Sequence, residues 1–130
     1  MIKPDAVGKN AVGAIIHQVE QNGFRVVEMV MQQLSRERAA GFYEVHNERP
    51  FYNDLIDFMT SGPSVQLALE RDDAVKTLRE VVGATDSQRA EPGTIRNLFG
   101  TDVQFNAVHA SDSVENGLKE SAFFFGSDAR

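Results

Sequence analysis

The sequence contains no cysteine, and none of its apolar runs approaches the ~18–20 residues that would cross a bilayer. The absence of cysteine excludes a disulfide framework and a thiolate metal site. Residues 1–5 also lack the apolar segment and the cleavage site of a secretory signal. We therefore expect a cytoplasmic protein that has no membrane partner.

Positive charge is scarce, because 13 basic residues stand against 19 acidic ones and give a net charge of −6. Non-specific binding to DNA or RNA depends on a cationic surface, so we expect no nucleic-acid partner. A small basic pocket for a phosphate ligand is still compatible with this overall balance.

Several common site motifs are missing as well. The chain contains neither GxxxxGKS/T nor GxGxxG, so a nucleotide site here would use neither a P-loop nor a Rossmann turn. Its three histidines, His17, His46 and His109, are scattered without HExxH-type spacing. No metal site built from protein side chains is therefore predicted.

The length and composition are typical of one globular domain over residues 1–130, with 42% hydrophobic and 25% charged residues. Apolar spacing predicts a first strand ending at residues 2–5 and further strands at 24–34, 65–69 and 106–109. Helices are predicted around residues 12–19, 36–45, 51–59, 74–82 and 112–125, with Ser35 capping the second and Asp72 or Asp73 the fourth. Residues 83–100 are expected to be a loop with one helical turn from Thr94.

This order, β-α-β-α-α-β-α-β-α, predicts an α/β or α+β domain in which a sheet is layered with helices. A βαβ…βαβ skeleton with an extra helical hairpin is the split βαβ, or ferredoxin-like, sandwich. We therefore predict a ferredoxin-like antiparallel sheet covered by helices. The residue pattern by itself does not decide between parallel and antiparallel pairing.

The segment Asn106–Ser113 (NAVHASDS) carries the clearest candidate for chemistry. A short apolar run ends at His109, and small, hydroxylated and acidic residues then favour the start of a helix. A neutral imidazole is a nucleophile at physiological pH, and the backbone N–H groups of a new helix can face an anion. The alternative is a histidine that lies in a loop and has no catalytic role.

Three cations stand at places suited to an anionic ligand. Lys3 lies at a predicted strand end, Arg79 flanks the apolar face of the 74–82 helix, and Arg96 follows the Pro92-Gly93 turn. Each one alone is most simply a solvated surface charge. Phosphoryl transfer, however, needs a cluster of such groups around the phosphate oxygens.

Seven segments, taken in order and with their spacing, resemble the nucleoside diphosphate kinase family over residues 1 to about 125. They are residues 2–7 (IKPDAV), 41–43 (GFY), 49–51 (RPF), 60–63 (TSGP), 83–85 (GAT), 92–96 (PGTIR) and 106–113 (NAVHASDS). The resemblance implies a homo-oligomeric enzyme that moves the γ-phosphoryl group of a nucleoside triphosphate, such as ATP, to a nucleoside diphosphate by a ping-pong mechanism.

The resemblance also implies roles for single residues. His109 matches the histidine that is phosphorylated, Glu120 the acceptor of a hydrogen bond from its other ring nitrogen, and Ser111 an assisting hydroxyl. Further matches are the ribose contacts Lys3 and Asn106, the phosphate contacts Arg79, Thr85 and Arg96, the catalytic Tyr43, and Phe51 with Val103 on the two faces of the base. Mg²⁺ is expected to arrive with the nucleotide, held by phosphates and water rather than by a protein cage.

The chain departs from the family pattern in three places. Only Met1 and Ile2 precede Lys3, so either the first strand is short and loses ladder hydrogen bonds and core area, or further residues precede Met1. Ala110 replaces a usual glycine, which would cost on the order of 1 kcal/mol if that position requires positive φ. Ser87 replaces a frequent proline, which predicts a looser loop and a less stable assembly.

These departures motivate an alternative from another class, a catalytically impaired nucleotide-binding or interaction module of the same fold. A histidine phosphocarrier is a second enzymatic alternative, although it would have no need for Phe51 or the three phosphate contacts. The chain stops soon after Phe125-Gly126, which favours a dimer or a tetramer, and the resemblance also allows a hexamer.

Overall fold

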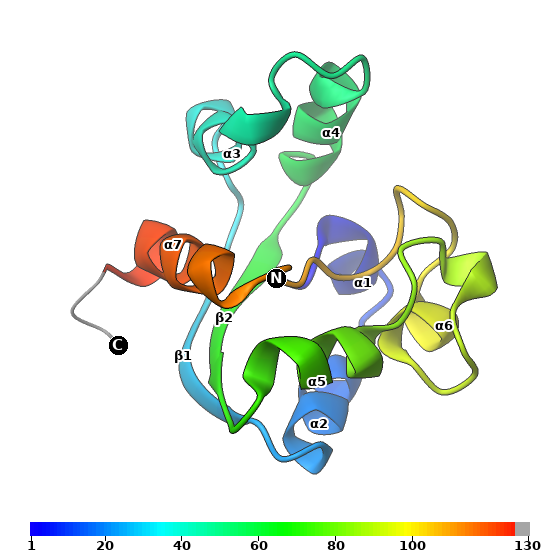
Figure 1. Ribbon diagram of the computed structural model, residues 1–130. Coiled ribbons are helices and arrows are strands. Elements are labelled where there is room, and N and C mark those ends of the chain that lie inside the picture. Colours follow the sequence, from blue (N-terminus) through cyan, green and yellow to red (C-terminus); the bar gives the residue numbers. More distant parts are fainter. Residues whose placement is uncertain (127–130) are drawn as a thin grey trace.

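The computed structural model of the protein describes residues 1–126 and is shown in Figure 1. Its helices are α1 (Pro4–Gly8), α2 (Val12–Gln21), α3 (Arg36–Phe42), α4 (Tyr52–Met59), α5 (Ala74–Val82), α6 (Ile95–Phe99) and α7 (Val114–Phe125). Two 3₁₀ turns, η1 (Glu44–His46) and η2 (Ser87–Arg89), and two strands, β1 (Arg25–Gln32) and β2 (Ser64–Glu70), complete the order.

The sheet is antiparallel, as the ferredoxin-like arrangement requires. β1 pairs with β2 so that Met29 lies opposite Leu67. On the other side of β2, Ile2 forms an antiparallel bridge to Val65 and a second antiparallel bridge to Val108. The spatial order is therefore β1, β2, the segment at residue 2 and the segment at residue 108, which confirms the predicted fold class.

The first and the last predicted strands are each reduced to a single bridge. The chain turns into α1 at Pro4, because the fixed φ of proline suits the first position of a helix, so the expected strand 2–5 ends at Lys3. At the other edge, Ala107 has a left-handed φ of 73° and interrupts the expected strand 106–109. Helix α1 was not predicted.

Local sequence signals mark most of the other helix boundaries, but the expected cap of α5 and the expected end of α3 differ from the structure. Ser35, Thr94 and Ser113 cap α3, α6 and α7, each accepting a hydrogen bond from a backbone N–H three residues later. The prediction that an aspartate side chain caps α5 is wrong, because Asp73 has a φ of 52° and makes no such bond. Helix α3 stops at Phe42, and η1 takes over where the longer helix was expected.

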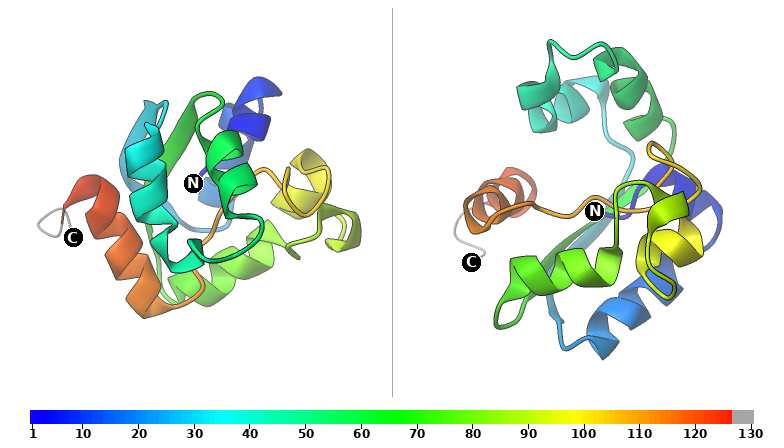
Figure 2. Two further views of the ribbon diagram at one scale, coloured as in Figure 1. Left: turned by 90° about the horizontal axis from the view of Figure 1, so that it is seen from above. Right: turned by 45° about the vertical axis from the view of Figure 1, so that its right-hand side comes forward.

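Two apolar clusters hold these elements together. The larger one joins the sheet to α2 and α5 through Ile2, Ile15, Val65, Val82 and Val108, among others. The smaller one joins α3 to α4, which stand together at one end of β1 and β2 while α2 and α5 lie at the other end (Figures 1 and 2). No helix in residues 1–126 is long and apolar enough to span a bilayer.

Candidate active site

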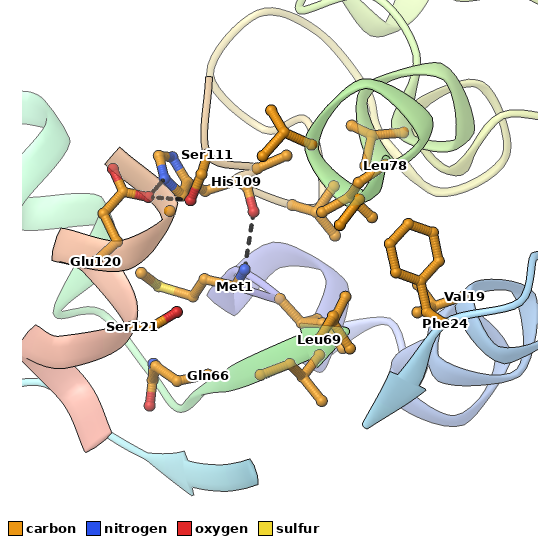
Figure 3. Close-up of a pocket in the computed structure, with 18 of the residues that line it drawn as sticks. Met1, Val19, Phe24, Gln66, Leu69, Leu78, His109, Ser111, Glu120 and Ser121 are labelled. Carbon is orange, nitrogen blue, oxygen red and sulfur yellow. Dashed lines mark hydrogen bonds and ion pairs between the residues drawn. The ribbon is translucent and has the colours of Figure 1, made fainter. Parts of the chain in front are cut away.

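The backbone of His109 is fixed against the start of the chain. Its N–H donates to the Met1 carbonyl over 2.8 Å, and the Met1 amino group donates to the His109 carbonyl over 2.8 Å. These two bonds extend the bridge between Ile2 and Val108 by one residue. The imidazole therefore projects from a fixed backbone position, immediately before the chain turns toward α7 (Figure 3).

One carboxylate oxygen accepts two side-chain hydrogen bonds beside this ring. Glu120 Oε1 lies 2.7 Å from His109 Nε2 and 2.7 Å from Ser111 Oγ, as the dashed lines in Figure 3 mark. An ionised carboxylate only accepts hydrogen bonds, so Nε2 must carry the proton. Nδ1 of a neutral His109 then keeps its lone pair, which is the condition for a nucleophile.

Both groups of this pair are held in the useful ionisation state. Burial lowers the pKa of His109, and this effect exceeds the opposing one of the hydrogen bond to Glu120, so the ring is neutral at neutral pH. Burial alone would raise the pKa of Glu120, but the hydrogen bonds from His109 and Ser111 and the charge of a protonated His109 together hold it below its usual range.

Two aromatic rings of α3 and its C-cap border the imidazole. Phe42 meets His109 edge-on with ring centroids 5.3 Å apart, and the Tyr43 ring lies 6.3 Å away. The Tyr43 hydroxyl is buried and has no hydrogen-bond partner among the described residues. Burial raises its pKa, so the phenol remains a proton donor. Phe42 was not singled out in the sequence, although it stands in the GFY segment.

Lys3 and Asn106 are brought together from opposite ends of the chain. Lys3 Nζ donates to Asn106 Oδ1 over 2.8 Å in a buried contact, and burial lowers the lysine pKa to about 8. Asn106 Nδ2 donates to the carbonyls of Thr85 and Val103, each over 3.0 Å. Four of the predicted site residues thus form one connected group, in which Lys3 retains further N–H donors.

Arg96 is buried and ties two site segments to each other. Its guanidinium donates to the Gly83 carbonyl over 3.1 Å and to the Val108 carbonyl over 2.9 Å, while its Nε is buried without a partner among the described residues. Burial, together with the charge of Arg79, lowers the Arg96 pKa to about 10, so the group stays charged at neutral pH. Arg79 is exposed.

The two residues expected at the base lie at the surface. Phe51, at the N-cap of α4, is 49% exposed, and Val103, in the loop before Asn106, is 59% exposed. The Phe51 ring lies 5.8 Å from that of His46, which in turn lies 6.4 Å from that of Tyr43. Helix α4 also meets the 101–105 loop, because Phe58 and Phe105 pack edge-on at 4.8 Å.

The anticipated cost at Ala110 does not arise, because this residue is absent from the positions with positive φ within residues 1–126. The left-handed residue is instead Ala107, which is fully buried. Asp5 Oδ2 accepts a hydrogen bond from the Ala107 N–H over 3.0 Å and so holds the strained backbone before His109. This hydrogen bond was not predicted from the sequence, because no sequence pattern marks an alanine that adopts a positive φ.

Ser87 connects its loop to the neighbouring one. The residue is buried, and its hydroxyl donates to the Asp102 carbonyl over 3.2 Å. A proline at this position has no side-chain hydroxyl with which to make this bond. This hydrogen bond therefore holds the loop in place at Ser87.

The described residues offer no dedicated metal cage, because residues 1–126 contain no group of three or more His, Asp or Glu side chains placed to hold an ion. Cations and hydrogen-bond donors gather around one neutral histidine in an antiparallel ferredoxin-like domain. This arrangement is that of a protein suited to anionic ligands.

Comparison with known proteins identifies the family. A sequence model described as nucleoside diphosphate kinase matches residues 1–129, and the chain belongs to this family. A nucleoside diphosphate kinase of Nitratiruptor sp. is 58% identical over 125 residues, which are 96% of this chain and 91% of that protein. One from Lawsonia intracellularis is 50% identical over 130 residues, covering 100% and 94% of the two chains.

Solved structures agree in fold. A nucleoside diphosphate kinase from Aquifex aeolicus superposes with a TM-score of 0.93 at 46% identity, covering 95% of this chain and 90% of that one. The halophilic enzyme from Halobacterium salinarum, in complex with CDP, also reaches a TM-score of 0.93, at 36% identity and with 98% and 86% of the chains covered.

Proposed function

We propose that this chain transfers the γ-phosphoryl group of a nucleoside triphosphate to a nucleoside diphosphate through phosphorylated His109. The observation that carries the proposal is the 2.7 Å hydrogen bond from His109 Nε2 to Glu120, which leaves Nδ1 with its lone pair on a buried, neutral ring. Membership of the nucleoside diphosphate kinase family supports the same reaction.

In the first half-reaction, Nδ1 attacks the γ-phosphorus and forms an N–P bond. The bond from the γ-phosphorus to the bridging oxygen breaks, and its electron pair leaves with the nucleoside diphosphate. The ring gains positive charge, which the Glu120 carboxylate stabilises through Nε2–H. In the second half-reaction, a terminal β-phosphate oxygen of another nucleoside diphosphate attacks the same phosphorus and His109 is released.

The surrounding residues supply binding rather than covalent chemistry. Tyr43 offers a buried, unpartnered hydroxyl, and Lys3 offers spare N–H donors next to Asn106. We assign phosphate contacts to Arg79, Thr85 and Arg96, and the two faces of the base to Phe51 and Val103. Stacking on an exposed aromatic ring tolerates any base, which suits transfer among different nucleotides.

We propose Mg²⁺ as the accompanying cation, coordinated by nucleotide phosphates and water. Mg²⁺ usually retains several waters and is bound largely through substrate phosphates, so it needs no dedicated cluster of protein carboxylates. When bound, Mg²⁺ neutralises charge on the transferring phosphoryl group.

We further propose that the enzyme is a cytoplasmic homo-oligomer, which is a dimer, a tetramer or a hexamer. Exposed apolar side chains on β1 support association, because Met29 is 57% and Met31 54% exposed.

Intact-mass spectrometry after brief incubation with Mg-ATP at neutral pH tests the proposed reaction. We expect one acid-labile phosphoryl group, which disappears on addition of GDP while GTP forms. His109→Ala should abolish the added mass, whereas His17→Ala, an exposed histidine on α2, should retain it. Nucleotide binding without any phosphorylated protein would instead favour a non-catalytic binding module.

A further inference from the structure

The connection between α3 and α4 contains one side chain that is turned inward. Every residue from 44 to 50 is exposed except His46, which is half-buried. This connection includes η1 and joins the two helices that stand together at one end of the sheet (Figures 1 and 2). The position of the His46 ring is therefore explained by the side chains that it contacts.

The His46 ring lies between two aromatic rings of the proposed site. It stacks on Tyr43 with ring centroids 6.4 Å apart and planes inclined at 30°, and it meets Phe51 at 5.8 Å and 54°. Tyr43 in turn lies 6.3 Å from His109. These contacts form a continuous row of rings from the proposed nucleophile to the aromatic side chain assigned to the base.

The two neighbours of His46 differ in how firmly they are held. Tyr43 is 6% exposed, and its N–H donates to the Ala39 carbonyl of α3 over 3.0 Å. Phe51 is 49% exposed, and within residues 1–126 His46 is the aromatic side chain that its ring contacts. A half-exposed ring without support on one side samples several rotamers and loses that freedom when a base stacks on it. The fixed Tyr43 ring supports His46, and His46 limits the positions open to Phe51.

Backbone hydrogen bonds fix the same arrangement. The His46 N–H donates to the Tyr43 carbonyl over 2.8 Å, and the Arg49 N–H donates to the His46 carbonyl over 2.9 Å. Phe51 follows two residues later, and its carbonyl accepts from the Leu55 N–H of α4 over 2.9 Å. Successive turns therefore hold His46 at a set place between the end of α3 and the start of α4.

We propose that His46 is a positioning residue, which holds the Phe51 ring in the orientation that a nucleotide base needs for stacking. The inference rests on the proposed function, because that function assigns the base to Phe51. A ring that is already ordered loses less conformational entropy on binding, so His46 increases the affinity for ligands that carry a base. A ligand without a base gains nothing from this contact.

Equilibrium binding of two ligands tests the proposal by calorimetry. One is ADP, and the other is ribose 5′-diphosphate, which is the same molecule without the base. His46→Ala should weaken ADP binding about 3- to 10-fold, the scale of one aromatic contact, and should leave the binding of ribose 5′-diphosphate unchanged. Val45→Ala, at a neighbouring side chain that is 85% exposed, should change neither affinity. Equal losses for the two ligands, or no loss for either, would overturn the proposal.

Two further variants separate ring packing from a polar contact. His46→Phe keeps an aromatic ring between Tyr43 and Phe51 and should restore most of the ADP affinity. His46→Gln keeps a polar side chain without a ring and should behave like His46→Ala. Rescue by glutamine but not by phenylalanine would mean that His46 binds the nucleotide directly, which contradicts the positioning role.

The binding test does not depend on phosphoryl transfer. A native chain that binds ADP but forms no phosphohistidine would refute the proposed reaction, while the comparison of the His46 variants would keep its meaning. If the native chain binds ADP no more tightly than ribose 5′-diphosphate, no base stacks on Phe51 and the positioning role is wrong.

Discussion

Replacing Glu120 by glutamine tests whether the charge next to His109 contributes to phosphoryl transfer. Glutamine keeps the size of the side chain and an oxygen that can accept from Nε2, but it removes the negative charge. A hydrogen bond to a charged group contributes about 1.5–3 kcal/mol and a neutral one about 0.5–1.5 kcal/mol. The positively charged phosphohistidine ring should therefore lose roughly 1–2 kcal/mol of stabilisation.

This loss corresponds to a slower first half-reaction, by roughly 5- to 30-fold. The assay is single-turnover phosphorylation by Mg-ATP, quenched and followed by intact mass. Glu115→Gln is a matched control, because Glu115 lies on the same helix with a 79% exposed side chain paired to Lys119 over 3.3 Å. Unchanged phosphorylation in Glu120→Gln would refute the role assigned to the hydrogen bond.

The pH dependence of the same assay gives a second test. Protonation of His109 removes the lone pair from Nδ1, so the rate should be level at high pH and fall as the ring becomes charged. Because burial lowers the pKa of His109, the midpoint should lie below about 6.5, the value of a free imidazole. Glu120→Gln removes an effect that raises this pKa and should move the midpoint further down.

Three further substitutions test contacts that hold the site, each measured as a free energy of unfolding in urea. Ala107→Val places a β-branched side chain at a buried residue with a φ of 73° and should cost at least about 2 kcal/mol. Arg96→Lys cannot bond both backbone carbonyls that the guanidinium holds and should cost about 1–3 kcal/mol. Ser87→Ala deletes the hydrogen bond to Asp102 and should cost about 1 kcal/mol.

The order of the two strands and of the longer helices, and the candidate histidine, were predictable because their signals are local. Apolar spacing marks α2 and α5, and the hydroxyl caps at Ser35 and Ser113 mark where α3 and α7 begin. The ferredoxin-like arrangement then follows from the order of these elements. Strands were also predicted at residues 2–5 and 106–109, but not that each would be reduced to a single bridge, because neither the start of α1 at Pro4 nor the left-handed φ of Ala107 was foreseen.

Of the contacts between distant segments, one was expected from the family resemblance and another was not expected at all. The pairing of His109 with Glu120 was expected only through the resemblance to a family, and the structure places the two atoms 2.7 Å apart. The anchoring of Ala107 by Asp5 spans 102 residues of sequence and had no signal at all. Side chains that bond backbone groups across a fold follow no spacing rule, because their partners are set by how the elements pack.

The sequence by itself determined the class of fold, the candidate nucleophile at the end of a predicted strand and the candidate residues for binding an anion. The tertiary structure decided how these residues are used. It engaged Arg96 with two backbone carbonyls and joined Lys3 to Asn106. A local sequence pattern predicts which face of a helix or strand is apolar. The burial of a side chain and its hydrogen-bond partners depend on neighbours that only the folded chain brings close.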